Sequence, residues 1–329
     1  MNKINNDLIC PIDGSGITQQ SNKFLYFKKF KYPIISGIPC LYTDINNNNR
    51  DGKKLINVKK FYTKYPFPNY NEFDDIERFI KVAKKNHFSK LLSQQLGDNK
   101  KILEIGCGTG QLTNYLAATT FSKKIYGTDL SLNSLKLAND FKKKNNLSNI
   151  EFVQTNLFHP CFRKSSMDLV ISNGVIHHTY NSEIGFYKIS ELVKPGGYII
   201  ISLYNYLGRL ITLINRFLYK IFGIKGLFLD KYLKSNISLQ KKNSWIQDQY
   251  NHPVESLHSM GDVLNWFQKY KISFISSIPK IIGKFGDNEE LFRKQLIGDI
   301  VDRFNVQFEM IFNYQFKEGG LFTMIGKKY

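Results

Sequence analysis

The chain has 329 residues, which suffices for one large α/β domain with additions or for two domains of ordinary size. Hydrophobic residues make up 42% of it and aromatic residues 14%, a composition that excludes an intrinsically disordered chain. The 46 Lys and Arg against 27 Asp and Glu give a formal net charge of +19, which would attract nucleic acid, an anionic membrane surface or an acidic substrate. The lysines are scattered along the chain, however, so a compositional bias explains the same charge.

Cysteine usage and the absence of long apolar runs indicate the compartment. The four cysteines, Cys10, Cys40, Cys107 and Cys161, have irregular spacing that matches no disulfide framework. The first residues lack the apolar core of a signal peptide, and no run of about 18 apolar residues predicts a membrane span. These features predict a soluble cytoplasmic protein.

The first hundred residues are predicted to precede the main domain. Residues 1–45 form a small module of their own, because apolar runs alternate with Gly and Pro between Tyr32 and Leu41, as in small β-rich modules. The polar stretch from Asn46 to Lys54 is a predicted linker. Two prolines in the aromatic run 61–70 exclude a regular helix there, and this run is a candidate cover over a ligand cleft or simple core packing. Residues 75–96 have helical periodicity, so we assign 46–99 to a linker and cap helix region.

From residue 100 to residue 329, strand-like and helical segments alternate. Apolar strands are predicted near 101–105, 124–128, 150–154, 167–172, 197–203, 271–279 and 321–326. Repeated βα units predict an α/β, Rossmann-like fold, with a seven-stranded, mostly parallel sheet and helices on both faces. A helix is expected around 260–270. Two insertions interrupt the pattern, at 204–260 and at 280–318, and the second is largely helical in its periodicity.

A glycine-rich run, Leu103 to Gly110, follows the first of these strands and precedes a helix that begins near Gln111. Glycines let the backbone turn sharply and approach a ligand closely. Such a loop alone would also suit a dinucleotide-binding enzyme. The spacing here is Gly-x-Gly-x-Gly, whereas the dinucleotide fingerprint is Gly-x-Gly-x-x-Gly.

Two acidic residues accompany this loop. Glu104 lies in the strand just before it, where the cationic amino acid end of S-adenosyl-L-methionine (SAM) would be stabilised. Asp129 ends the next strand, in position for ribose hydroxyls, a feature that nicotinamide enzymes share.

Five motifs in this order resemble those of class I SAM-dependent methyltransferases, from Lys100 to about Ser202. They are Lys101–Gly110, Tyr126–Ser131, Asn156–Leu157, Asp168–His178 and Lys194–Tyr198. The resemblance implies that SAM is the methyl donor. It implies cofactor contacts by Glu104, Gly106, Gly108, Gly110, Asp129, Leu130, Asn156, Leu157 and Asn173. Asn156 stands where the family often has an acid near the adenine.

The candidate catalytic residues fall in two places. A hydroxyl or ring-carbon acceptor needs a base, for which His is the usual side chain. His177 and His178 follow the fourth strand, next to the expected position of the methyl group, although histidines occur there in the resembling family without a catalytic role. In the first insertion, the polar run from Asp248 to Glu255 contains Tyr250 and His252, which could line an acceptor pocket.

The acceptor is predicted to be a small or lipid-like metabolite. Residues 206–222 combine an apolar face with Arg209, Arg216 and Lys220, a pattern that suits either a peripheral helix on a membrane surface or a core-facing helix. RNA is the alternative acceptor, on the grounds of the net charge and of the N-terminal module. A catalytically inactive binding module is a third reading, against which the intact glycines and the two carboxylates argue.

The N-terminal module resembles small zinc-ribbon-like proteins that accompany tRNA and protein methyltransferases, through Leu8–Pro11 and Tyr32–Pro39. A ribbon needs paired Cys-x-x-Cys ligands. Asp13 occupies the second position of the first pair, and only Cys40 remains later. We therefore expect no metal, and a role for the module in docking or in facing the substrate.

Overall fold

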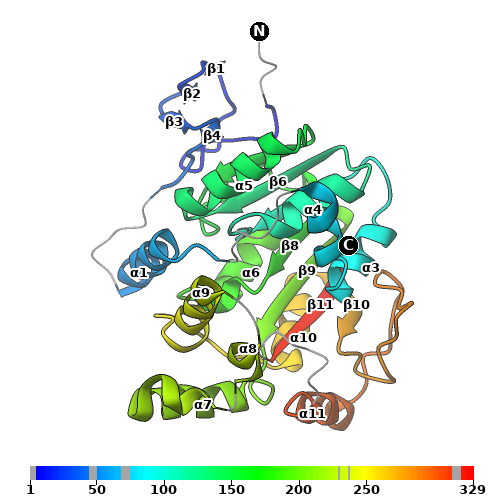
Figure 1. Cartoon of the computed structure of the whole chain (residues 1–329). Helices are drawn as coiled ribbons and strands as arrows, with labels where there is room; N and C mark the ends of the chain where they lie inside the picture. The colour runs from blue at the N-terminus through cyan, green and yellow to red at the C-terminus, as the bar shows by residue number, and fades with distance from the viewer. Residues whose placement is uncertain (1–4, 44–49, 68–74, 229, 236–237, 313–319) are drawn as a thin grey trace.

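The computed structural model describes residues 5–43, 50–67, 75–228, 230–235, 238–312 and 320–329. A central sheet of seven strands runs through it (Figure 1), in the order β10-β11-β9-β8-β5-β6-β7. The strands are β5 (Lys101–Ile105), β6 (Lys124–Asp129), β7 (Ile150–Gln154), β8 (Met167–Asn173), β9 (Val193–Tyr204), β10 (Ile272–Ile278) and β11 (Leu321–Lys328). Neighbouring strands from β9 to β7 are parallel, and β11 is antiparallel to both β9 and β10. The predicted seven-stranded, mostly parallel sheet is confirmed.

The central strands are apolar on both sides because helices cover both faces of the sheet. Leu103 and Val170 belong to one core cluster with α6 (Ser182–Ser190) and α10 (Met260–Lys269). Their chain neighbours Ile102 and Ile171 point to the opposite face, toward the helices that precede and follow β5. Those helices are α2 (Ile76–Ala83), α3 (His87–Gln95) and α4 (Gln111–Thr119), while α5 (Leu132–Lys144) packs beside β7. Continuous apolar strands of this kind are typical of buried parallel sheets.

The N-terminal module is a separate four-stranded antiparallel sheet, at the top of Figure 1. Its strands are β1 (Gln19–Gln20), β2 (Phe24–Tyr26), β3 (Lys31–Ile35) and β4 (Ile38–Pro39). The module packs on the main domain, since its buried Leu25 and Phe27 belong to the same core cluster as Leu103. Asp7 fastens it further, because its carboxylate accepts hydrogen bonds from Lys101 Nζ at 2.6 Å and from the Tyr126 hydroxyl at 2.8 Å.

Two predictions for the cap region are wrong in their boundaries. Helix α1 (Arg50–Lys64) covers the end of the expected linker and the start of the aromatic run. It can form because Leu55 and Val58 provide an apolar face that is buried, and because the two prolines come only after the helix has ended. The single helix expected over 75–96 is two helices, since the Asn86 side chain accepts from Ser89 N and starts α3.

The two insertions have different structures. The first contains α7 (Leu210–Phe222), the 3₁₀ turn η2 (Gly223–Leu227), α8 (Lys231–Lys234) and α9 (Leu239–Tyr250). The second was expected to be largely helical, but within its described residues only α11 (Ile300–Glu309) is an α-helix. Residues 282–298 are irregular and are held by the side chain of Gln95, which bonds Glu289 O and Leu291 N. Gly283, Gly286 and Gly298 weaken the helical state there.

Candidate active site

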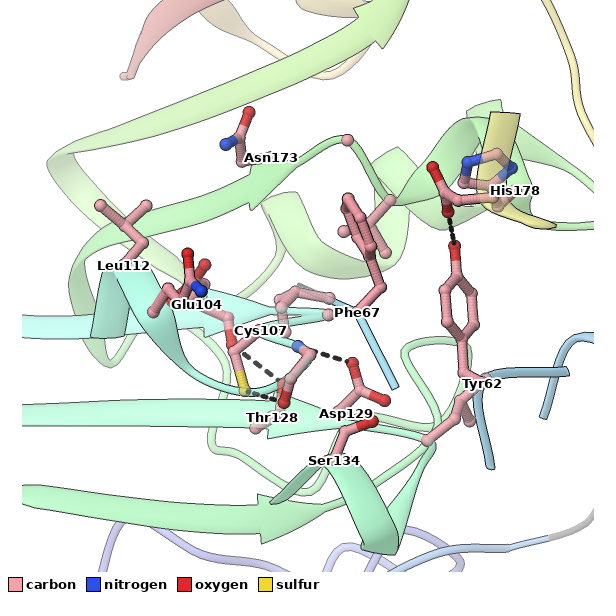
Figure 2. Close-up of a pocket in the computed structure, with 18 of the residues that line it drawn as sticks. Tyr62, Phe67, Glu104, Cys107, Leu112, Thr128, Asp129, Ser134, Asn173 and His178 are labelled. Carbon is pink, nitrogen blue, oxygen red and sulfur yellow. Dashed lines mark hydrogen bonds between the residues drawn. The ribbon is translucent and has the colours of Figure 1, made fainter. Parts of the chain in front are cut away.

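A cavity of about 610 Å³ opens at the carboxyl ends of β5, β6 and β8 (Figure 2). Parallel α/β sheets bind ligands at this edge. The glycine-rich loop after β5, the residues after β6 and the end of β8 form three of its walls. Helix α1 and the insertion between β9 and α10 contribute the fourth.

The glycine-rich loop makes close approaches that require glycine. Gly106 has φ +70°, and a Cβ on it would lie 2.4 Å from Val175 Cγ1. Gly110 has φ +75°, and a Cβ there would lie 2.7 Å from Ala138 Cβ. These positions combine the left-handed region with a lack of space, so any side chain would displace the loop from the cavity edge. Gly110 is the N-cap of α4, which begins at Gln111 as expected, and it is not among the residues that line the cavity.

Glu104 lies in β5 as a buried carboxylate at the cavity wall. Burial raises its pKa to about 7, and the hydroxyl of Thr113, which donates to it, opposes this shift. No Lys or Arg within the described residues contributes to that pKa. A buried acid without a cationic neighbour is suited to receive an ammonium group from a ligand.

Asp129 is fixed at the end of β6 by backbone donors. Gly108 N donates to Oδ2 over 2.9 Å, and Ser131 N donates to Oδ1 over 2.8 Å. Burial raises the pKa of Asp129 despite these bonds. Each carboxylate oxygen has more than one lone pair, so the group can accept further bonds from hydroxyls in the cavity.

The structure places most of the predicted cofactor residues at the cavity. Its lining includes Glu104, Gly106, Gly108, Asp129, Leu130, Leu157 and Asn173. Asn156 is different, because its side chain is fully buried and bonded within the protein. Its amide donates to Thr43 O at 3.5 Å, and its oxygen accepts from Phe158 N at 3.1 Å. Thr155 and Leu157 on either side line the cavity instead.

The other end of the cavity is aromatic and contains a second buried acid. Its lining includes Tyr62, Phe67, His178, Tyr204, Tyr232 and Trp245. Asp248 from α9 lies among them, where Tyr62 Oη donates to Oδ1 over 3.3 Å and Gln249 Nε2 donates to Oδ2 over 2.9 Å. Burial raises the pKa of Asp248 to about 6, and these donors oppose the shift. Figure 2 shows the Tyr62 hydroxyl pointing toward the same end of the cavity as His178.

The rings of His177 and His252 both contact the ring of His178, and only His178 lines the cavity. His178 is at the wall, with its Nδ1 2.8 Å from Val254 O and its ring centroid 3.7 Å from that of His252. A carbonyl only accepts, so Nδ1 carries the proton and Nε2 has the lone pair. Burial, together with His177 and His252, holds the pKa of His178 well below its usual range. His177 lies behind it, fully buried.

Tyr250 is not brought to the cavity. Its hydroxyl is buried in the insertion and donates to Asp230 Oδ2 at 2.5 Å. Asp248 and Tyr250 are two positions apart on α9, so they point to different sides of the helix. That periodicity is the signal by which the sequence could have separated them, and Asp248 is the residue that the sequence analysis left unselected.

A buried ion-pair cluster supports the aromatic end. Glu255 accepts from Arg209 at 2.8 Å and from Arg216 at 2.9 Å, and Arg209 lies 3.7 Å from the Tyr204 ring centroid. Burial would raise the pKa of Glu255, but the two guanidinium groups lower it to about 2. The two carboxylates of the polar run 248–255 therefore differ in position. Asp248 lies at the cavity, and Glu255 holds the wall behind it in place.

The fold, the glycine-rich loop and the two carboxylates beside it resemble those of class I SAM-dependent methyltransferases. Residues 96–248 match the model of a family described as a methyltransferase domain. Among curated relatives, an uncharacterized protein of Synechococcus is 32% identical over 116 residues, which is 35% of this chain and 28% of that one. A demethylmenaquinone methyltransferase of Lactococcus lactis is 29% identical over 133 residues, 40% of this chain and 53% of that one.

One further relative and one solved structure are also similar to this chain. A fatty-acid O-methyltransferase of Mycolicibacterium smegmatis is 27% identical over 103 residues, 31% of this chain and 36% of that one. The solved structure of PKMT2 from Rickettsia typhi has a TM-score of 0.50 and 13% identity, covering 73% of this chain and 52% of that one, a likeness of fold. The chain spans 28% to 54% of the length of the first four curated relatives.

Proposed function

We propose that this protein transfers the sulfonium methyl group of SAM to a hydroxyl group of a small or lipid-like acceptor. The observation that carries the proposal is that one cavity is lined both by the Glu104 and Asp129 carboxylates and by the aromatic group around Asp248. A single cavity of about 610 Å³ lies in the usual range for a small-molecule site. Two of the matched relatives are named for apolar small molecules, demethylmenaquinone and a fatty acid.

The cofactor end fits SAM by the chemistry of its residues. Glu104 would pair with the amino group, and Asp129 would accept from the ribose hydroxyls. Leu130 and Leu157 offer apolar contact for the adenine, while Gly106 and Gly108 line the cavity without a side chain, beside the chain that joins the two ends. When bound, SAM supplies an electrophilic methyl group.

The acceptor end fits a hydroxyl that must lose its proton. The acceptor oxygen forms a bond to the methyl carbon as the sulfur–methyl bond breaks, and the hydroxyl proton passes to Asp248. With a pKa of about 6, Asp248 is mainly ionised at neutral pH and ready to take that proton. Tyr62 and Gln249 hold the carboxylate in place.

His178 is the second candidate base, through its Nε2 lone pair. Its pKa is held well below the usual range by burial and by the two histidines beside it, so it attracts a proton less strongly than Asp248 does. We therefore assign the base to Asp248 and give His178 the role of shaping the wall. His177, His252 and Tyr250 are assigned no contact with the acceptor.

Transfer of labelled methyl groups tests the proposal. The protein is incubated with [methyl-³H]SAM and a fractionated cell extract, and the label is followed into solvent-extractable small molecules, RNA and protein. We expect label in the solvent-extractable fraction. Label in RNA would favour the alternative acceptor suggested by the net charge of +19, and label in no fraction, with SAM bound, would favour an inactive binding module.

A further inference from the structure

Helix α7 has its apolar side turned outward. Leu210, Ile214, Phe217 and Ile221 follow one another at helical spacing, and all four are exposed, Phe217 to 64%. The residue of α7 that is buried is polar, namely Asn215. A core-facing helix would show the reverse pattern, so that interpretation of residues 206–222 is wrong. Phe222, Ile224 and Phe228 extend the exposed apolar surface into and beyond η2.

A second exposed stripe runs along α11. Ile300, Phe304, Phe308 and Phe312 recur every four residues and are exposed. The three phenylalanine rings contact in series, with centroids 6.1 Å and 5.6 Å apart. Figure 1 shows α7 and α11 at the same end of the molecule, opposite the N-terminal module. Exposed apolar surface on this scale marks a site of interaction.

The exposed charged side chains in and after α7 are basic. Between residues 206 and 247 the sequence contains Arg209, Arg216, Lys220, Lys225, Lys231, Lys234, Lys241 and Lys242, against the single acid Asp230. That acid is buried, where it accepts hydrogen bonds from Trp245 and Tyr250. Lys220, Lys225 and Lys234 are exposed. Among the described residues of this segment, no exposed acid balances them.

We propose that this surface docks on a membrane that contains anionic lipids. The apolar–basic face is defined as the exposed apolar side chains of α7 and η2 together with Lys220, Lys225 and Lys234. An interfacial helix buries its apolar side at the boundary of headgroups and acyl chains, while lysines around it meet anionic headgroups. Within the described ranges, no helix has the length and hydropathy needed to span a bilayer.

A second copy of the chain fits this face less well. Two copies would bring the same lysines against one another without an acidic partner from the segment, and a net charge of +19 on each copy would add repulsion. An anionic lipid surface supplies both the missing negative charge and the apolar phase. The charge balance therefore selects the lipid surface as the occupant.

The same insertion also forms the wall of the cavity. Tyr232 and Trp245, whose ring centroids lie 4.3 Å apart, line its aromatic end and belong to α8 and α9. Docking would thus hold the acceptor wall near lipid, where a lipid-like acceptor is concentrated. This last consequence rests on the proposed function, whereas docking itself does not and is tested without SAM.

Vesicle sedimentation tests the proposal with the full chain. Vesicles of phosphatidylcholine alone are compared with vesicles that also contain about 30% phosphatidylglycerol. We expect binding to the anionic vesicles that weakens as NaCl rises from about 0.1 M to about 0.5 M. Phe217→Ser/Ile221→Ser removes only exposed side chains, so the fold should persist, and we expect at least about tenfold weaker binding. Phe121→Ser, at an 85% exposed site outside the face, is the matched control and should bind as the wild type does.

The charged part of the face has its own pair of variants. Lys220→Gln/Lys225→Gln should weaken binding to anionic vesicles, whereas Lys123→Gln/Lys144→Gln removes the same charge from exposed sites elsewhere and should have a smaller effect. The proposal is overturned if the wild type binds neutral and anionic vesicles equally. It is also overturned if a variant of the face binds the anionic vesicles as its control does. So does light scattering that shows a dimer which Phe217→Ser/Ile221→Ser dissociates, since the occupant would then be a second copy.

Discussion

The Tyr62 hydroxyl donates a hydrogen bond to Asp248 Oδ1 over 3.3 Å, between two residues 186 positions apart in the sequence. This bond joins α1, from the cap region, to α9, from the insertion after β9, at the aromatic end of the cavity. Burial raises the pKa of the Tyr62 hydroxyl, so it remains a donor at neutral pH. The proposed acceptor site thus combines two segments outside the strand–helix repeats of the main domain.

Replacing Asp248 by Asn should remove the base while keeping the shape of the wall. We expect kcat to fall by roughly 10²- to 10⁴-fold, because that is the usual contribution of a positioned base. The affinity for S-adenosylhomocysteine should stay within about twofold, since Asp248 lies at the other end of the cavity. Tyr62→Phe, which removes one donor but keeps the carboxylate, is the milder comparison. Unchanged turnover in Asp248→Asn would remove Asp248 from the mechanism.

The pH dependence of Asp248 gives a second check. Its folded pKa of about 6 lies above the ordinary value of 3.8, so the ionised carboxylate destabilises the folded state. The stabilisation by its protonated form is present below pH 3.8 and is lost as pH rises through about 6. Activity of the wild type should therefore fall below about pH 6, and Asp248→Asn should melt at a higher temperature than the wild type at pH 8. A melting temperature that is lower in the variant at pH 8 would contradict this sign.

Glu104 should make cofactor binding depend on pH. The pKa of Glu104 is raised to about 7, and an incoming ammonium group favours its ionised form, so binding should weaken as pH falls through 7. Titration of S-adenosylhomocysteine at pH 6 and pH 8 measures this difference. In Glu104→Gln the affinity should be lower and the pH dependence should be reduced. An unaltered pH dependence in the variant would mean that another group titrates.

Glu255 should matter for stability rather than for chemistry. Its pKa is lowered to about 2 from the ordinary 4.5, so its stabilisation is present above pH 4.5 and is lost as pH falls toward 2. Glu255→Gln removes the buried carboxylate that both Arg209 and Arg216 contact, which should lower the free energy of unfolding by about 3 kcal/mol at pH 7. Denaturant unfolding of the variant and of Glu290→Gln, an exposed ion-pair control, measures the difference. An equal decrease in the free energy of unfolding in the two variants would show that burial of the ion-pair cluster does not stabilise the fold.

The sheet and the position of Glu104 and Asp129 at one cavity edge were predictable because their signals are local. Strand β5, the glycines after it and Asp129 at the end of β6 follow one another within thirty residues, and parallel strands bring their carboxyl ends to one edge. Asn156 was harder, since the bonds that bury its side chain come from Thr43 and from the turn after β7. Nothing in its neighbourhood along the chain reveals the partner from the N-terminal module.

The acceptor end was predicted less well because its contacts are distant in sequence. Asp248 meets Tyr62 only after α1 has folded across the cavity, and the polar run that contains it offered Tyr250 and His252 as equally plausible side chains. For helix α7, the signal is local but does not decide the orientation of the helix. Its apolar periodicity predicts an amphipathic helix correctly, but periodicity alone does not say whether the apolar side faces the core or the outside.

The central claim is that the cavity edge at Glu104 and Asp129 binds SAM, and calorimetric titration with S-adenosylhomocysteine tests it most directly. We predict one binding site per chain in the wild type and in Asp140→Ala, a control at an exposed position on α5. In Asp129→Ala, the loss of the carboxylate should weaken binding by about tenfold to a hundredfold, with the fold retained. Absence of binding in the wild type, or equal affinity in Asp129→Ala, would contradict the account.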